Sequence, residues 1–323
     1  MTGHVIALCG GVGGAKLAFG LTKILDPGDL TLVVNTGDDF CHLGLQICPD
    51  LDTVAYTLAG LSDRERGWGM AGETWNFMAA LRRLGGESWF QLGDQDLAIH
   101  VERSRRAAKG DTLSQITTDL TAALGISHAV VPMSDQPVKT IIQTATGELA
   151  FQRYFVAEAC RPAATGVRFE GADAASASPA LLTALMRRDV SAVVICPSNP
   201  YLSIDPILSI PGVREGLAAI GAPVVAVSPI VGGEAIKGPA AKLMRELGAC
   251  PGALAVANHY RGLVDGLVID RTDAAEAGAL RVAGVSPLVT DSIMKTDADR
   301  ICLAIQTLEL ASRLDARTRQ AAT

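Results

Sequence analysis

The chain has no stretch of apolar residues approaching the ~18 positions of a membrane-spanning helix, although 49% of its 323 residues are hydrophobic. It also lacks the basic start and small-residue cleavage site of a secretory signal peptide. Its seven cysteines form no Cys-x-x-Cys pair, so the sequence predicts neither a disulfide framework nor a zinc site. From these absences we expect a cytoplasmic protein without a membrane partner.

The chain carries little net charge for its size. The formal charge is −6, and lysine and arginine are dispersed rather than gathered in a run. Such a balance disfavours a surface that binds nucleic acid, but it allows a small anionic ligand. We therefore expect a small-molecule substrate and no nucleic-acid partner.

A glycine-rich loop follows the first apolar run of the sequence. Val5–Leu8 leads into Gly-Gly-Val-Gly-Gly-Ala-Lys. Glycines between a strand and a helix let the backbone approach an anion, and N–H groups at a helix start donate to it. The loop is not a P-loop, because Leu17 follows the lysine, and it lacks the third small residue of the dinucleotide fingerprint. A tight strand-to-helix turn is the alternative interpretation. The candidate phosphate-binding residues are Gly10, Gly11, Gly13, Gly14 and Lys16.

Short β-branched runs alternate with longer helical patterns, which predicts a parallel sheet covered by helices. The expected strands are Val5–Leu8, Leu30–Val34, Ala192–Ile195 and Pro223–Val227. The expected helices are Gly14–Leu25, Leu51–Ala59, Glu73–Leu84, Leu113–Leu124, Pro179–Arg187, Val213–Ile220, Pro239–Leu247 and Asp297–Leu314. We predict an α/β fold with a Rossmann-like, doubly wound, mostly parallel sheet, in a single domain over residues 1–323.

The middle of the chain interrupts this alternation. Val138–Thr144 and Leu149–Phe155 are strand-like runs on either side of Ala-Thr-Gly-Glu, which is a hairpin signal. We therefore expect an inserted helical and β-hairpin region over about residues 60–175. Ligands of doubly wound sheets bind beyond the carboxyl ends of the strands, so residues at those ends are candidates for function.

Four carboxylates lie within fifteen residues after the second expected strand: Asp38, Asp39, Asp50 and Asp52. Magnesium in proteins takes one or two carboxylates together with phosphate oxygens and water. Capping of a helix or turn is the alternative role for one of the four, but not for all of them. We select Asp39 and Asp52 as the pair that holds Mg²⁺.

Two tryptophans stand in the segments Gly-Trp-Gly and Glu-Thr-Trp-Asn. A ring beside glycine keeps an open face on which a flat heterocycle can stack, so Trp68, Trp75 and Asn76 are candidates for binding such a ring. The alternative is that both rings pack the inserted region. Further on, His100 and Arg103 share a helix face, which either reaches a phosphate or faces solvent.

Two later strands end in loops of polar residues. Ser198 and Asn199 stand between two prolines, which fix the loop and aim its hydroxyl and amide at a ligand. Ser228 follows the next strand in Ser-Pro-Ile-Val-Gly-Gly. Together with the glycine loop, these residues predict a nucleotide site at three strand ends.

Taken in order, the loops form a set: Gly-Gly-Val-Gly-Gly-Ala-Lys, Asn-Thr-Gly-Asp-Asp, Cys-Pro-Asp-Leu-Asp-Thr, Gly-Trp-Gly, Leu-Gly-Asp-Gln-Asp, Ser-Asn-Pro and Ser-Pro-Ile. From about residue 4 to residue 300 this set resembles the 2-phospho-L-lactate transferase (CofD/FbiA) family of coenzyme F420 biosynthesis. The resemblance implies a Rossmann-like fold, a homodimer and magnesium. It also implies a transferase that joins a phospho-three-carbon acid, carried as a guanosine diphosphate conjugate, to the deazaflavin Fo.

The resemblance assigns roles to particular residues. Asp52 and Gln91 stand at the positions of the family's Fo-binding pair, with Gln91 in place of a basic residue. Asp39 and Asp52 would hold the metal, and the glycine loop with Ser198 and Asn199 would hold the guanosine diphosphate part. Asp205 stands where the family often has glycine.

The implied reaction needs alignment and charge neutralisation rather than a covalent group of the protein. The ribityl hydroxyl of Fo attacks the phosphorus that bears the three-carbon acid, and GMP leaves. Magnesium, Lys16 and backbone N–H groups neutralise the diphosphate, and a carboxylate such as Asp39 accepts the hydroxyl proton. The expected catalytic residues are Asp39, Asp52 and Lys16, and a partner guanylyltransferase would supply the conjugate.

Two questions stay open at the level of sequence. The acid can be 2-phospho-L-lactyl, phosphoenolpyruvyl or 3-phosphoglyceryl, and the Trp-rich segment favours enolpyruvyl. The alternative function is that of a non-enzymatic UDP-sugar-binding regulator of the related gluconeogenesis-factor family, which shares the fold and a similar glycine loop. Gly-Trp-Gly and Ser-Asn-Pro favour the transferase.

Overall fold

The computed structural model describes residues 3–321, and its centre is a parallel sheet. The strands follow the order β14-β13-β10-β9-β1-β2-β5, and each neighbouring pair is parallel. Their bounds are β1 His4–Cys9, β2 Leu30–Val34, β5 Ala129–Pro132, β9 Val190–Ile195, β10 Val224–Val227, β13 Gly266–Asp270 and β14 Ser286–Thr290. The Rossmann-like α/β fold and all four expected strands are confirmed. β5, β13 and β14 complete the sheet without having been predicted.

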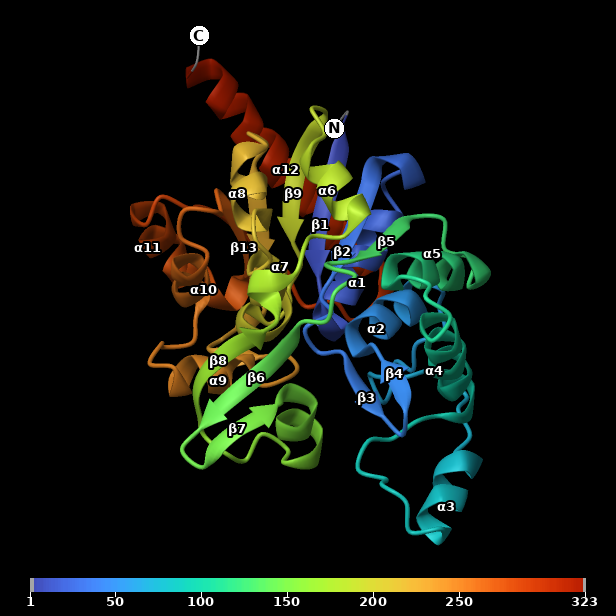
Figure 1. Cartoon of the computed structure of the whole chain (residues 1–323). Helices are drawn as coiled ribbons and strands as arrows, with labels where there is room; N and C mark the ends of the chain where they lie inside the picture. The colour runs from blue at the N-terminus through green and yellow to red at the C-terminus, as the bar shows by residue number, and fades with distance from the viewer. Residues whose placement is uncertain (1–2, 322–323) are drawn as a thin grey trace.

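Helices cover both faces of this sheet (Figure 1). Successive residues of β1 alternate between two core clusters, because neighbouring side chains of a strand point to opposite faces. One face packs on α1 Gly11–Thr22, α2 Pro49–Leu58 and α12 Asp297–Ala321. The other face packs on α6 Pro179–Leu185, α7 Asp205–Leu208, α8 Val213–Ala219, α9 Ala240–Glu246, α10 Ala253–His259 and α11 Ala277–Val282.

Two antiparallel units extend past the carboxyl ends of the parallel strands (Figure 1). One is the hairpin of β3 Phe40–His42 and β4 Leu45–Ile47, which packs on α4 Asp94–Ala107. The other is the sheet β7-β6-β8, built from β6 Lys139–Thr144, β7 Gly147–Ala150 and β8 Ala164–Glu170. The predicted hairpin is therefore present. However, its second strand ends at Ala150, and the chain continues into a helical turn, η2 Arg153–Ala157.

Residues 60–175 do not consist only of elements inserted outside the central sheet. Alongside α3 Asn76–Arg83, α4, α5 Leu113–Ala123 and the antiparallel strands, this range contains β5, which pairs with β2 at the edge of the central sheet. The single domain over residues 1–323 stays a prediction, and residues 1–2 and 322–323 of that range lie outside the described residues. Among the described residues, no helix has both the length and the apolar character that crossing a membrane requires.

Helices α3 and α4 cap each other. Asp94 at the start of α4 accepts the N–H groups of Asn76 and Phe77 at the start of α3, each at 3.0 Å. Glu73, which precedes α3, accepts the N–H groups of Gln95 and Asp96 at 2.8 Å. Each carboxylate satisfies N–H groups that a helix leaves without partners in its first turn. This reciprocal pair fixes the segment between the two helices, which carries Gln91.

The remaining elements are short. They are the hairpin β11 Ile230–Val231 with β12 Glu234–Ala235, and the turns η1 Pro27–Asp29, η3 Ala172–Ala174, η4 Pro200–Ile204 and η5 Arg271–Glu276. The turn η4 and the β11–β12 hairpin follow β9 and β10, and they stand beside the carboxyl ends of those strands.

Candidate functional site

A cavity of about 850 Å³ lies beyond the carboxyl ends of the parallel strands. The loops that follow β1, β2, β9, β10 and β14 all contribute to its wall, as the position of ligand sites in doubly wound sheets predicts. Apolar and polar side chains outside these loops also line it, among them Ile47 of β4, Phe90 and Gln91 before α4, and Phe151 and Phe155 after β7. The cavity thus joins the strand-end loops to apolar walls in one space.

The glycine loop turns directly into α1, which begins at Gly11 rather than at the expected Gly14. Gly11 adopts φ +62°, a left-handed conformation that glycine tolerates. A Cβ on Gly13 would lie 2.2 Å from the carbonyl oxygen of Pro197, and a Cβ on Gly14 would lie 2.4 Å from Ser198 Oγ. Close packing therefore requires glycine at these positions. Gly10, Gly11 and Gly13 also line the cavity, whereas Gly14 is buried behind it.

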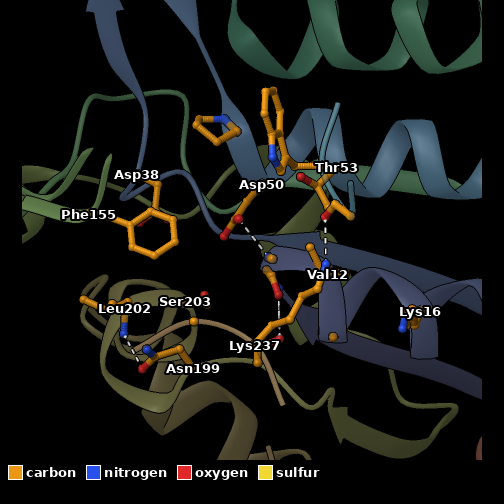
Figure 2. A pocket seen from close by; sticks show the side chains of 18 of the residues that line it. Val12, Lys16, Asp38, Asp50, Thr53, Phe155, Asn199, Leu202, Ser203 and Lys237 are labelled. Carbon is orange, nitrogen blue, oxygen red and sulfur yellow. Dashed lines mark hydrogen bonds between the residues drawn. The ribbon is translucent and has the colours of Figure 1, made fainter. Parts of the chain in front are cut away.

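Asp50 occupies the anion-binding position at the start of α1 (Figure 2). Its Oδ1 accepts the N–H of Gly11 at 2.8 Å, and its Oδ2 accepts the side-chain amide of Asn35 at 2.9 Å. Burial raises the pKa of Asp50 to about 6, although these two hydrogen bonds favour its charged form. The loop thus holds a carboxylate where a P-loop would hold a phosphate oxygen.

Asn35 fixes that carboxylate. It is fully buried at the end of β2 and also donates to the carbonyl of Leu202 at 3.2 Å. Its own Oδ1 accepts the N–H of Gly37 at 2.8 Å. The sequence alone does not predict this role, although Asn35 belongs to the Asn-Thr-Gly-Asp-Asp segment.

Asp38 and Asp39 differ in what they face. Asp38 lines the cavity, and its buried Oδ1 has no hydrogen-bond partner among residues 3–321. Asp39 does not belong to the wall, although its buried Oδ1 also has no hydrogen-bond partner among the described residues. Burial raises the pKa of both carboxyl groups well above the usual range, and the negative charge of Asp50 adds to this at Asp38 and that of Asp52 at Asp39. Two buried carboxylates that face the same space, Asp38 and Asp50, are a setting in which a divalent cation would relieve desolvation and repulsion.

Asp52 belongs to a separate buried network on the floor of the cavity. Arg103 forms an ion pair with both of its oxygens, one of them at 3.1 Å. His100 Nδ1 lies 3.6 Å from Asp52, and its Nε2 lies 3.3 Å from Asp96, which accepts the hydroxyl of Tyr56. Ligand atoms of Asp52, Asp96 and His100 lie within 4.8 Å of one another, so this group could also hold a metal. The guanidinium of Arg103 already compensates Asp52, which makes this group less suited to a cation than Asp38 and Asp50.

The tryptophans lie one behind the other. Trp68 lines the cavity and keeps 44% of its surface exposed, whereas Trp75 contacts it edge to face at 6.1 Å and does not belong to the wall. The guanidinium of Arg66 lies 5.1 Å from the ring of Trp68 and 4.8 Å from that of Trp75. Asn76 is also outside the wall, and its amide donates to Asp94 at 3.0 Å. The roles of Trp75 and Asn76 stay predictions.

The other predicted residues lie in the wall. Gln91 accepts from Arg82 at 2.6 Å and donates to the carbonyl of Ser88 at 2.8 Å. Ser198 joins the loops after β1 and β9, since it accepts the N–H of Gly10 at 3.1 Å and donates to its carbonyl at 2.9 Å. Ser228 bonds to both backbone groups of Ile230 and so holds a turn.

Asn199 and Lys16 keep polar groups at the cavity. Asn199 Oδ1 caps η4, but its buried Nδ2 has no partner among the described residues, and it lies in the wall. Lys16 Nζ donates to the carbonyl of Met294 at 2.9 Å. Burial and the nearby charges of Arg300, Lys237 and Arg64 lower the pKa of Lys16. These two residues are positioned to donate to a bound ligand.

The fold and the cavity define a class: a Rossmann-like α/β protein with a large ligand cavity beyond its parallel strands. Residues 5–305 match the family described as 2-phospho-L-lactate transferase CofD. The chain belongs to this transferase family, so the predicted resemblance is confirmed.

Curated relatives align over nearly the whole chain. A phosphoenolpyruvate transferase of Kitasatospora aureofaciens is 40% identical over 314 residues, which cover 94% of this chain and 97% of the relative. A phosphoenolpyruvate transferase of Streptomyces griseus is 40% identical over 320 residues, or 97% and 100% of the two chains. A 2-phospho-L-lactate transferase of Methanosarcina mazei is 39% identical over 290 residues, or 90% and 94%.

The fold also occurs in a solved structure of a more distant protein. A member of the UPF0052 family from Bacillus halodurans superposes with a TM-score of 0.63 and 16% identity, covering 95% of this chain and 99% of that one. This likeness concerns the fold alone.

Proposed function

We propose that this transferase moves a phospho-three-carbon-acid group from a guanosine diphosphate conjugate to the deazaflavin Fo, giving (dehydro)coenzyme F420-0 and GMP. The observation that carries the proposal is the continuity of the cavity. The glycine loop and Asn199 line the same space as Trp68, Gln91 and three phenylalanines. Two large ligands, a nucleotide and a ring system, can therefore meet inside it.

The nucleotide part suits the strand-end loops. The first turn of α1 contains N–H groups that an α-helix leaves without partners, and Lys16 lies in the wall close by. The free Nδ2 of Asn199 is a donor for a carbonyl oxygen of a base. Ser198 supports this binding indirectly, because its hydroxyl positions Gly10.

The ring of Fo suits the apolar parts of the wall. Trp68, Phe90 and Phe155 offer apolar ring surfaces there, and Gln91 offers an amide for the polar edge of a heterocycle. Asp52 and Gln91 both line the cavity, as the Fo-binding role predicted for them requires.

Magnesium suits the space between the two ligands. We infer that Asp38 and Asp50 hold it, since both line the cavity and are desolvated. The predicted pair of Asp39 and Asp52 remains a hypothesis with less support, because Asp39 lies outside the wall and Asp52 is paired with Arg103. When bound, the ion would neutralise negative charge on the diphosphate.

The residues of the chain then have two tasks. They hold the ribityl hydroxyl in line with the phosphorus that bears the acid, and they accept the proton that this hydroxyl loses. A new P–O bond to Fo forms as the P–O bond to GMP breaks. Asp39 was the predicted base, but the carboxylates of the wall, Asp38 and Asp50, have the access that this role requires.

We infer that the acid is enolpyruvyl, because relatives 40% identical to the chain are named phosphoenolpyruvate transferases. We also propose a cytoplasmic homodimer that receives its donor from a partner guanylyltransferase. The test is an incubation with Fo, GTP, magnesium, that guanylyltransferase and one phosphoacid at a time, followed by mass spectrometry. A product formed from phosphoenolpyruvate supports the proposal, and a product formed only from 2-phospho-L-lactate or 3-phosphoglycerate contradicts the choice of acid.

A further inference from the structure

A second cavity of about 210 Å³ adjoins the first on the Val12–Lys16 face of α1. We call it the basic side cavity. In the view of Figure 2, Lys16 lies to one side of Val12, and Asp50 and Asn199 lie to the other. Two acidic residues, Asp63 and Glu65, also line it. Its five cationic lining residues are Lys16, Arg64, Lys237, Lys295 and Arg300. Five positive and two negative side chains leave a formal charge of +3 in the wall.

Neighbouring groups compensate only part of this charge. Asp297 pairs with Arg64 at 3.0 Å and with Arg300 at 3.2 Å, so one carboxylate serves two guanidinium groups. Asp63 is engaged by the N–H groups of Glu65 and Arg66 at 3.0 and 2.8 Å. The cavity therefore keeps an excess of positive charge.

Two lysines of the basic side cavity donate hydrogen bonds to uncharged backbone groups. Lys16 donates to the carbonyl of Met294 at 2.9 Å, and Lys237 donates to the carbonyl of Gly67 at 3.4 Å. Carbonyl oxygens satisfy N–H donors but carry no net charge. Both lysines thus remain available to an anion.

Arg300 is the most buried of the five cations. Only 4% of its surface is exposed, and its Nε has no hydrogen-bond partner among the described residues. Its guanidinium also lies 5.2 Å from the ring of Phe19, a contact that leaves the Nε donor unsatisfied. Burial and the charge of Arg64 lower the pKa of Arg300. A buried donor without a partner is costly, which is the property expected of a group that awaits a ligand.

We propose that the basic side cavity binds the carboxylate of the three-carbon acid of the donor. This inference rests on the proposed function. The donor carries two anionic groups, the diphosphate and this carboxylate. The diphosphate suits the first turn of α1, and Lys16 follows Val12 by one helical turn on the same face. A guanidinium and ammonium groups are the partners that a carboxylate binds best.

The subsite explains how donors that differ in their carbon skeleton can share one protein fold. Lactyl, enolpyruvyl and glyceryl groups all carry the same carboxylate, so the cations would recognise what the acids have in common. The uncharged part of the wall, which includes Thr53, Tyr56 and Thr57, would then discriminate between the acids.

The test uses Lys295→Gln and Arg300→Gln, with Arg271→Gln as the matched control, because Arg271 is an exposed cation that pairs with Asp291 and lines neither cavity. The Michaelis constant for the purified donor conjugate is measured together with the calorimetric dissociation constant of GDP. GDP has the diphosphate but no carboxylate. We expect the donor constant to rise by about tenfold or more in both test variants. The GDP constant should stay within about twofold of wild type.

Other outcomes overturn the inference. If the variants lose GDP affinity to the same extent, the cations hold the diphosphate. If the Michaelis constant for the donor conjugate is unchanged, the cations have only a structural role. If Arg300→Gln does not fold, Lys295→Gln and Arg300→Lys carry the test. Calorimetric titration of phosphoenolpyruvate with GMP present separates this inference from the proposed function. If the wild type transfers nothing to Fo, the function fails, whereas loss of phosphoenolpyruvate binding in the variants still tests the subsite.

Discussion

Asp50 accepts the N–H of Gly11 at 2.8 Å, so a carboxylate from α2 already binds the backbone N–H with which α1 begins. This contact separates the loop from a P-loop, in which backbone N–H groups cradle phosphate oxygens. A phosphate that approaches the loop therefore meets a negative charge, unless a cation lies between them. The arrangement makes Asp50 the residue on which the proposed chemistry depends.

Substitution Asp50→Asn should lower the rate of transfer by about a hundredfold or more, because it removes charge from the proposed cation site. The amide oxygen can still accept the N–H of Gly11, and the fold should persist although the hydrogen bond from Asn35 is lost. The measurement is kcat/KM over a magnesium titration, with the exposed Asp291→Asn as the control. Activity within threefold of wild type at saturating magnesium would remove Asp50 from the site.

The same variant should reveal the pKa of Asp50 through stability. The folded protein keeps this carboxyl protonated up to about pH 6, whereas the unfolded chain releases the proton near its ordinary value of 3.8. Wild type therefore loses stability relative to Asp50→Asn as the pH rises from about 4 to 6, by roughly 3 kcal/mol if the shift is fully expressed.

Urea unfolding of both proteins at several pH values, without magnesium, measures this difference. Magnesium should reduce the difference in stability between the two proteins at pH 7, because the ion stabilises the charged form of Asp50. A difference in the free energy of unfolding that does not change with pH would mean that Asp50 titrates normally.

Substitution Asp52→Asn tests whether this residue is a metal ligand or the partner of Arg103. Both side chains are buried, so removal of one leaves an unpaired charge, and we expect a loss of about 3–5 kcal/mol in the free energy of unfolding. The double variant Asp52→Asn/Arg103→Gln should recover more than half of that loss. Unchanged stability together with weaker magnesium binding would instead assign Asp52 to the metal.

The two tryptophans should differ in their effect on Fo. Trp68→Ala should raise the Michaelis constant for Fo by roughly fivefold, as expected for a stacking contact worth ~1 kcal/mol. Trp75→Ala should have a smaller effect, because its ring lies behind Trp68 and outside the wall. Fluorescence titration with Fo and calorimetry with GDP measure both affinities. If Trp68→Ala binds Fo normally, the ring site lies elsewhere.

Local sequence was enough to predict most of the sheet and its loops. The apolar runs of β1, β2, β9 and β10 are unambiguous, and the polar residues that follow them reach the cavity, because the ends of parallel strands meet at one edge. The sequence pattern does not predict β14, because this edge strand begins with Ser-Pro and proline is unfavourable within strands.

The contacts that define the site depend on the tertiary structure instead. Nothing near Asp50 in the sequence indicates that Gly11, 39 residues away, donates to it. Lys16 and Met294 are 278 residues apart, so the basic side cavity has no local signature. The apolar pattern predicts Phe155 at the end of a strand, but the turn η2 places it in the cavity wall.

The most direct test of the proposed function is a two-substrate reaction with purified components. The protein is mixed with magnesium, Fo and the guanosine diphosphate conjugate of phosphoenolpyruvate, and both products are quantified by chromatography with mass detection. The proposal predicts that GMP and an Fo phosphodiester that carries the enolpyruvyl group appear in a one-to-one ratio. Unconsumed Fo, together with tight binding of a UDP-sugar, would contradict the proposal and assign the cavity to a binding protein.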